Sequence, residues 1–177
     1  MTDDDRLGTL TVEGDRATMR FRRRLPHPIE AVWAALTDPA RRRAWFGGMT
    51  IDPRAGGLVE LMPENPPVPP DAKRVTGRIL VWSPPAPAGD AGTRPRSAVF
   101  AHEWRQRIVD DGTVRYELAE DGDHTVLTLI HEGLSVRNAQ GFIPGTHAFL
   151  DRLRASLDRG PIPDWGTQYA EVAPAYG

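Results

Sequence analysis

Two histidines and one tyrosine lie in stretches where polar and apolar residues alternate, which is the pattern of β-strands. Alternation places His131 and Tyr116 each on the apolar face of its own strand. His102 shares a face with Phe100 and Trp104, although the opposite face of that stretch is also partly apolar. If these faces point inward, imidazole and phenol groups stand in a mostly apolar wall, which suits a small-molecule pocket.

Each of these side chains also has a purely structural interpretation. A buried histidine is often satisfied by a backbone carbonyl, Asp151 could hold His147 from one helical turn away, and Tyr116 could be ordinary core. For Trp33 and Trp45, packing between helices is favoured over ligand contact. With these alternatives open, the candidate ligand-contact residues are Trp33, Trp45, Phe100, His102, Trp104, Tyr116, Leu129, His131, Phe142, Thr146, His147, Phe149, Leu150 and Leu153.

The sequence argues against several other kinds of site. It has no cysteine, which excludes disulfides, thiolate nucleophiles and cysteine-based zinc sites. The glutamates that follow His102 and His131 point to the opposite strand faces, so no compact metal-ligand set forms with His147. No serine lies in a nucleophile elbow, and no phosphate-binding or dinucleotide-binding motif is present. We therefore predict no metal, no cofactor and no assigned catalytic residue.

Length, charge and hydropathy fit a soluble protein. The chain has 177 residues, 26 % of them charged, and a formal net charge of −2, which favours neither nucleic acid nor a membrane as a partner. The acidic N-terminus is unlike a signal peptide, and the apolar runs are too short to span a bilayer. We expect a cytoplasmic location. The arginine runs 22–24 and 41–43 are interpreted as solvated surface.

The order of the predicted elements indicates how a pocket wall would be built. Residues 9–25 form a predicted hairpin, residues 29–37 and 39–46 form two short helices, and six strand candidates lie between Met49 and Leu134. An Asp-Gly pair predicts a hairpin between the last two strands. Two proline-rich segments, from Pro63 to Asp71 and from Pro84 to Arg96, are predicted loops.

One long amphipathic helix is predicted near the C-terminus, from Gly145 to Leu157. At about 100° per residue, the apolar residues from Phe142 onward fall on one stripe, which the sheet must cover. Pro144 suits the first turn of this helix. An antiparallel sheet with a single long helix on one face can curl around the helix and separate from it at one end. This arrangement predicts a cavity between helix and sheet.

The chain also resembles a known bacterial family. The segments that carry the resemblance are RRLPHPIEAVWAALTDPARRRAWF, GGLVEL, HEW, YELAEDGDHTVLTLIHEGL and GTHAFLDRLRASLDRGPIPDW. In this order they are similar to Hsp90-ATPase-activator-homologue-1-like proteins of the START/Bet v 1-like (SRPBCC) superfamily. The resemblance implies an α+β helix-grip fold, in which a curved antiparallel sheet wraps around a long C-terminal helix, with two short helices after the first strands and an apolar cavity.

The predicted cavity and the resemblance together suggest three alternative functions. The first is non-catalytic binding of a small hydrophobic or aromatic molecule, lipid-like or polyketide-like, in the cavity. The second is a cyclase or hydratase activity, as in some superfamily members, with His131, His102 or Tyr116 as general acid or base. The third is a stress-related Hsp90 co-chaperone. We do not expect the third, because a separate N-terminal domain of the eukaryotic activator carries much of the chaperone contact.

The family pattern differs from this chain at two positions. Thr146 stands where relatives usually have a tryptophan, and Phe149 stands where a second histidine is common. Both residues line the predicted cavity, so its shape cannot be copied from relatives.

The order of the predicted elements and the extent of the resemblance also predict the domain organisation. Residues 1–8 are a predicted flexible acidic N-terminus, residues 9–160 a single helix-grip domain, and residues 161–177 a tail that packs on or near it. A homodimer remains open, through the outer sheet face or through Trp82 and Trp165 if these are exposed.

Overall fold

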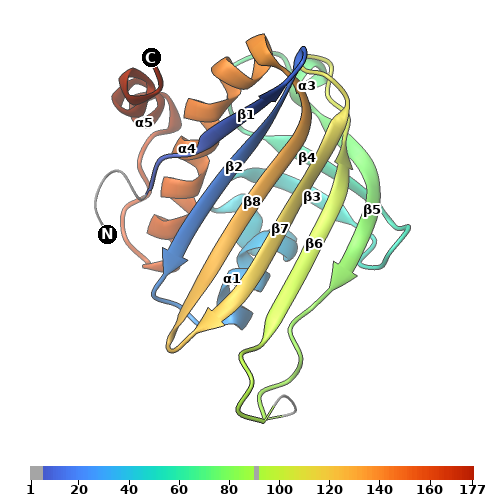
Figure 1. Cartoon of the computed structure of the whole chain (residues 1–177), viewed down its shortest axis with the longest axis vertical. Helices are drawn as coiled ribbons and strands as arrows, with labels where there is room; N and C mark the ends of the chain where they lie inside the picture. The colour runs from blue at the N-terminus through green and yellow to red at the C-terminus, as the bar shows by residue number, and fades with distance from the viewer. Residues whose placement is uncertain (1–5, 90–91) are drawn as a thin grey trace.

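The computed structural model describes residues 6–89 and 92–177 and contains one antiparallel sheet with a long helix across one face (Figure 1). Its strands are β1 (Thr9–Glu13), β2 (Arg16–Leu25), β3 (Gly47–Ile51), β4 (Leu58–Pro63), β5 (Val75–Ser83), β6 (Ser97–Trp104), β7 (Gly112–Asp121) and β8 (His124–Ser135). Its helices are α1 (Ile29–Thr37), α2 (Pro39–Arg43), α3 (Pro70–Lys73), α4 (Val136–Leu157), α5 (Trp165–Val172) and the 3₁₀ helix η2 (Ala173–Tyr176).

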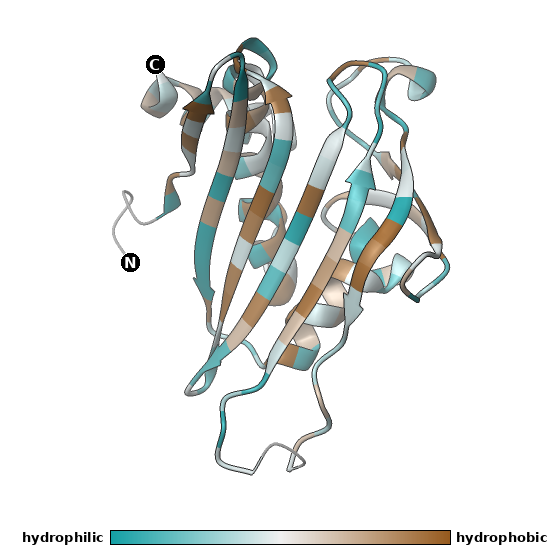
Figure 2. Cartoon of the chain, turned by 45° about the vertical axis from the view of Figure 1, so that its right-hand side comes forward, coloured by the Kyte–Doolittle hydropathy of each residue, from teal (hydrophilic) through white to brown (hydrophobic). Residues whose placement is uncertain are grey.

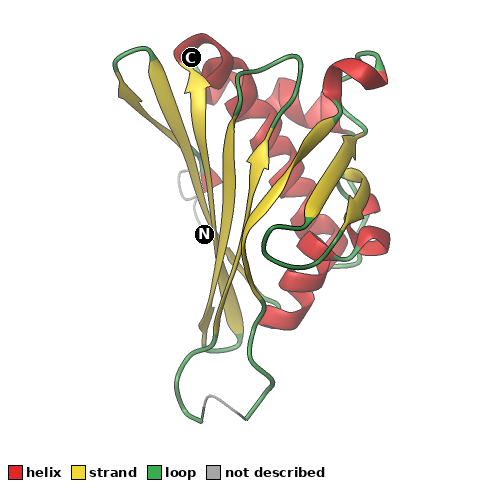
Figure 3. Ribbon diagram, turned by 90° about the vertical axis from the view of Figure 1, so that its right-hand side faces the viewer, coloured by secondary structure: helices red, strands yellow, loops and turns green. Residues whose placement is uncertain are grey.

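The eight strands lie in the order β1-β2-β8-β7-β6-β5-β4-β3, and every neighbouring pair is antiparallel. Seen from the side, the curved sheet forms one layer and α4 runs across its concave face (Figure 3). The two short helices α1 and α2 follow the first strands, as predicted. This is the α+β helix-grip architecture, so the predicted fold class is confirmed.

Alternation along the strands separates the two faces of the sheet (Figure 2). In β2, every second residue from Ala17 to Leu25 is buried, and the residues between them are mostly exposed. In β6 the face that carries Phe100, His102 and Trp104 points inward, which settles the choice that the sequence left open. The inward faces of these strands, together with α4, form the core.

Helix α4 begins nine residues earlier than predicted. Ser135 caps it, because its side-chain oxygen accepts a hydrogen bond from Asn138 N at 3.2 Å. Pro144, which was expected in the first turn, lies inside the helix. The extra turns bring Arg137, Asn138 and Gly141 alongside the sheet, where they become part of the site described below.

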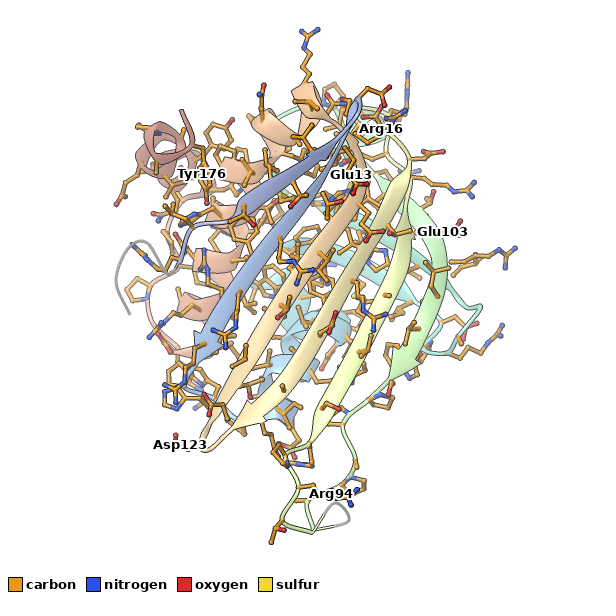
Figure 4. All side chains as sticks on the ribbon, viewed as in Figure 1. Glu13, Arg16, Arg94, Glu103, Asp123 and Tyr176 are labelled. Atoms are coloured by element: carbon orange, nitrogen blue, oxygen red, sulfur yellow. The ribbon has the colours of Figure 1, made fainter. Side chains whose placement is uncertain are left out.

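The C-terminal segment packs on α4. Trp165 of α5 donates from Nε1 to Gly145 O at 3.1 Å and is only 8 % exposed, so it is not an open contact surface. Tyr176, labelled beside α5 in Figure 4, accepts a hydrogen bond from Gly8 N at 2.9 Å. Of the predicted flexible N-terminus, residues 1–5 lie outside the described part of the chain.

A buried polar cluster joins α4 to β2 and to the C-terminal segment. Arg23, interpreted as surface from its arginine run, is instead only 3 % exposed, and its NH1 lies 2.9 Å from Asp151 Oδ1. Asp151 Oδ2 accepts from Gln168 Nε2 at 2.7 Å and lies 3.3 Å from His147 Nε2, in poor hydrogen-bond alignment. His147 Nδ1 lies 2.7 Å from the Tyr176 hydroxyl.

Candidate functional site

A cavity of about 500 Å³ lies between the inner face of the sheet and the N-terminal half of α4. Its inner walls come from β2, β6, β7, β8, α4 and the segment after α2, and its rim comes from the end of β4 and the segment after it, the β6–β7 connection and α5. The exposed residues Ile108, Arg137 and Gly141 mark the rim. The predicted ligand-contact residues that line the cavity are Trp45, Trp104, Tyr116, Leu129, His131, Phe142, Thr146, Phe149 and Leu150.

Three of the predicted contacts lie in the packed wall on the β5–β6 side instead. Trp33 packs on Trp82, with ring centroids 5.0 Å apart, and Phe100 packs between them and Tyr116. His102 lies behind the cavity wall, against the rings of Phe100 and Trp104. Phe100 and His102 face inward as expected, whereas Trp33 of α1 is half-buried, and all three pack against other aromatic rings.

The other two predicted contacts that do not line the cavity lie on α4. His147 belongs to the polar cluster with Asp151 and Tyr176, and its ring also contacts Phe21 of β2. Leu153 is buried one turn beyond Leu150 and is not a lining residue. The interpretation that Asp151 holds His147 therefore describes the structure better than ligand contact does.

Sequence reasoning missed several lining residues on loops. Pro63 is the last residue of β4, Asn65 and Pro66 come from the proline-rich segment after it, and Gln106 and Val109 come from the β6–β7 connection. Lys73 orders the first loop, because its Nζ donates to the backbone oxygens of residues 64 and 66 at 2.8 and 3.3 Å. No periodic signal places a loop against a site, so composition alone could not find these contacts.

The chemistry of the lining is aromatic and lacks acids. It includes three tryptophans, three phenylalanines and two tyrosines, with His131 as the histidine among them. Arg137 at the rim is the charged residue of the described lining, which contains no aspartate or glutamate. Such a wall favours flat apolar rings and offers a few polar groups for orientation.

His131 is a buried neutral imidazole in this wall. Its ring centroid lies 5.2 Å from that of Trp104 and 5.6 Å from that of Phe142, and its Nε2 has no hydrogen-bond partner. Burial, with a smaller contribution from His102, lowers the pKa of His131 to about 3. At neutral pH its ring is therefore uncharged, and its Nε2 is a buried polar atom that the protein leaves without a hydrogen bond.

His102 is held by the backbone. Its Nδ1 donates to Glu103 O at 2.8 Å, which leaves Nε2 as an acceptor without a partner. Burial lowers the pKa of His102 to about 4, against the raising effect of that hydrogen bond and together with the charge of Arg42. The expected structural role of a carbonyl-bonded histidine is thus the one observed.

The two histidines predict a loss of stability in acid. Both folded-state pKa values lie below the ordinary 6.5, so the unfolded chain binds more protons below that pH. The stabilisation that the two neutral rings contribute is fully present above about pH 6.5. It is lost as the pH falls toward the folded-state pKa values of about 4 and about 3. For the two histidines together, the free energy of unfolding measured in urea should be about 3–4 kcal/mol lower at pH 5 than at pH 7.

A His131→Leu variant should lose about half of this pH dependence, because His102 alone then titrates. The matched control is His124→Gln at the β7–β8 turn, where the partly exposed ring pairs with Asp123; it should keep the full dependence. A wild-type difference below about 1 kcal/mol would contradict the burial of both rings.

Arg42 corrects the interpretation of the second arginine run as surface. It is 0 % exposed, and its guanidinium donates from NH1 to Leu36 O at 2.9 Å and from NH2 to the Tyr116 hydroxyl at 3.3 Å. The guanidinium carbon also lies 4.3 Å from the ring centroid of Phe46 and 5.1 Å from that of Trp45. A buried cation thus stands behind three of the aromatic residues that line the cavity.

No cluster of three or more potential metal-ligating side chains occurs among residues 6–89 and 92–177. Within that same part of the chain, no helix has the length and apolarity required to cross a bilayer.

Comparisons with solved structures support the same fold. The crystal structure of CalU16 from Micromonospora echinospora is 25 % identical, with a TM-score of 0.68 over 96 % of this chain and 92 % of that chain. The solution structure of the BPP1335 gene product of Bordetella parapertussis is 25 % identical, with a TM-score of 0.63 over 93 % and 86 %. The DynU16 crystal structure, at 20 % identity and a TM-score of 0.59 over 85 % of this chain and 49 % of that one, shows the fold alone.

No curated protein matches the chain. Residues 26–158 match the family model described as Activator of Hsp90 ATPase homolog 1-like protein. Because this match covers most of the 177 residues, the chain belongs to the family of Activator of Hsp90 ATPase homolog 1-like proteins.

Proposed function

We propose that this protein binds a small hydrophobic, aromatic molecule in the cavity between the sheet and α4, without transforming it. The observation that carries the proposal is the cavity of about 500 Å³ with its aromatic lining. That volume falls in the range of roughly 300–1,000 Å³ typical of small-molecule sites. A core that packed solidly under α4 would have left no room for a guest.

The exposed rim supports entry of a guest from solvent. Ile108, Arg137 and Gly141 are exposed, and Phe142 and Thr146 behind them are half-buried although they face the sheet. These half-buried side chains belong to the apolar stripe of α4, in which Leu150 and Leu153 are buried and Phe149 and Leu157 are half-buried. The stripe is therefore only partly covered by protein, and a guest would cover the rest.

A cyclase or hydratase activity is the second candidate, because His131 and Tyr116 both line the cavity. Efficient general bases have a pKa near the working pH, whereas burial lowers the pKa of His131 to about 3. The ring is therefore a weak base at neutral pH, and binding is favoured over proton transfer. Turnover of any bound ring compound, abolished in both His131→Leu and Tyr116→Phe, would favour the enzyme instead.

The aromatic lining of the cavity suggests which ligands to test first. A panel of polycyclic aromatic compounds, together with simple naphthalene and anthracene derivatives, is a suitable first screen. A ligand should be recognised by a higher midpoint of thermal unfolding, because ligand at 100 times its Kd adds about 2.7 kcal/mol to the free energy of unfolding.

A Thr146→Trp variant should block the site. Thr146 faces the cavity from α4, and an indole at this position would occupy the space that the guest needs. We expect binding of the best panel compound to weaken by about 100-fold or more, which corresponds to about 2.7 kcal/mol. Titration monitored by quenching of tryptophan fluorescence measures this change, since Trp45 and Trp104 line the cavity.

The control is Gln140→Trp, at an exposed position on the same helix outside the lining. This variant should bind like the wild type. Unchanged binding in Thr146→Trp, or no binding of any panel compound to the wild type, would contradict the proposed function.

A further inference from the structure

Arg42 is a buried cation without a buried anion. Within the described ranges 6–89 and 92–177, its hydrogen bonds go to a backbone carbonyl and to the hydroxyl of Tyr116, and no carboxylate pairs with it. Its Nε has no hydrogen-bond partner at all. Removing a charge from water is costly unless an opposite charge compensates it, and the aromatic rings of Trp45, Phe46 and Tyr116 around the guanidinium replace only part of that charge.

Tyr116 connects this cation to the cavity. Its hydroxyl oxygen accepts a proton from Arg42 NH2, and a guanidinium has no lone pair to accept one in return. The phenolic hydrogen therefore has no protein acceptor among the described residues. Tyr116 lines the cavity, so this hydrogen is available to a guest, and the hydrogen bond from Arg42 makes the hydroxyl a stronger donor.

The rest of the lining also favours a negatively charged guest. The described lining contains no carboxylate that would repel an anion or pair with a cation. The rings of Phe46 and Trp45 contact the guanidinium and line the cavity, whereas Arg42 itself is not a lining residue. Tyr116 is the polar lining residue that is hydrogen-bonded to Arg42. The neutral ring of His131, which contacts Trp104 and Phe142, adds no charge to the lining.

We propose that the guest is an aromatic anion, whose carboxylate, phenolate or enolate oxygen accepts a hydrogen bond from Tyr116 while Arg42 supplies the compensating charge behind it. This inference rests on the proposed function of the cavity and specifies the class of ligand. Tyr116 is then the residue that contacts the anionic oxygen, and Arg42 is the residue that positions and polarises Tyr116. The guest completes an ion pair that the protein itself leaves open.

The test compares anthracene-2-carboxylate with anthracene-2-carboxamide, which has nearly the same shape but no charge. Dissociation constants at pH 7.5 come from quenching of tryptophan fluorescence. We expect the wild type to bind the carboxylate at least about tenfold more tightly, the usual advantage of a hydrogen bond to a charged group. In Tyr116→Phe the preference should fall below about threefold, because the carboxylate loses a charge-assisted hydrogen bond and the carboxamide loses a weaker neutral one.

Two control variants separate this site from other sources of anion preference. Tyr169→Phe removes the second lining phenol, which donates to Gly141 O at 3.2 Å, and should keep the full preference. Arg137→Gln removes the exposed cation of the rim and should also keep it. Because the proposed partner is buried, the wild-type preference should persist at high salt, which would screen a contribution from Arg137.

A variant at the buried cation supplies an independent check. Arg42→Met should abolish the preference although Tyr116 is still present; if this variant does not fold, the salt series and Tyr116→Phe decide the question. Equal binding of carboxylate and carboxamide by the wild type would overturn the inference and leave the proposed function standing. A preference lost in Arg137→Gln and retained in Tyr116→Phe would also overturn it. Failure of every aromatic probe to bind would instead overturn the proposed function.

Discussion

The free energy of unfolding of an Asp151→Asn variant is expected to be about 3–5 kcal/mol lower than that of the wild type. Asp151 is the carboxylate that compensates buried Arg23, and their side chains are 9 % and 3 % exposed. Asparagine keeps the shape but not the charge, so the guanidinium would remain buried without its anion. Breaking a buried pair in this way costs far more than the pair contributes as a whole.

The same substitution should loosen the C-terminal segment. Asp151 Oδ2 accepts from Gln168 of α5, and His147 beside it contacts the hydroxyl of Tyr176. Tyr176 in turn accepts from Gly8 N, so one cluster on α4 holds both ends of the described chain. Hydrogen exchange of α5 amides should therefore accelerate in Asp151→Asn more than exchange in β7 and β8.

The pH dependence of this effect has a definite sign. Burial tends to raise the pKa of Asp151, but its contacts with His147, Arg23 and Gln168 outweigh burial and lower the pKa to about 2. Because that value is below the ordinary 3.8, the stability that Asp151 contributes is complete above about pH 4 and is lost as the pH falls toward 2. The difference between wild type and Asp151→Asn should shrink over that window.

The control for this prediction is Asp158→Asn, near the end of the same helix. Asp158 is 43 % exposed and pairs with His27 and Arg154. Exposed pairs contribute about 1 kcal/mol or less, so urea unfolding at pH 7 should hardly distinguish this variant from the wild type. Equal effects of Asp151→Asn and Asp158→Asn would show that Arg23 is solvated in the folded state.

The architecture could be predicted because its signals are local. Alternation identified the strands, and the turn glycines Gly14 and Gly122, both at φ of +62°, lie where the sequence placed hairpins. One long helix and one sheet face leave a single way to bury both apolar surfaces. The start of α4 was missed, because Pro144 resembled a first-turn proline and residues 136–140 carry few apolar side chains.

The two buried arginines were wrongly interpreted although their signals were present. Arg23 alternates in phase with Met19, Phe21 and Leu25, so strand geometry places it on the inward face. Arg42 precedes Trp45 and Phe46 by one helical turn, which puts it on their side of the chain. Both runs were treated as blocks of like charge, whereas the periodicity distinguishes one member of each run from its neighbours.

The cavity itself was only partly predictable. Periodicity determines which side chains point inward, and nine of the fourteen candidate contacts line the cavity as a result. It does not determine where the helix and the sheet separate, because that depends on packing between distant segments. The aromatic cluster around Phe100 fills one side of the interior, and the loop residues Asn65 and Pro66 close another.

Phe100 and Phe142 provide the sharpest test of where packing ends and the site begins. Both were candidate ligand contacts, yet Phe100 is 0 % exposed and surrounded by the rings of Trp33, Trp82 and Tyr116. Phe100→Ala should lower the free energy of unfolding by about 3–5 kcal/mol, the cost of a new buried void. Binding of an aromatic probe by the folded fraction should change by less than about threefold, because no lining group is lost.

Phe142→Ala should show the opposite balance. Phe142 is half-buried and faces Trp104 and His131, with ring centroids 6.3 and 5.6 Å away, so its loss enlarges a space that already exists. We expect a stability loss of about 1–2 kcal/mol and about tenfold weaker probe binding, since one aromatic contact is removed. Urea unfolding and fluorescence titration of the same two samples measure both quantities. If Phe100→Ala weakened binding as much as Phe142→Ala, the guest would reach behind the wall formed by Tyr116 and Trp104, and the site would be larger than the present cavity.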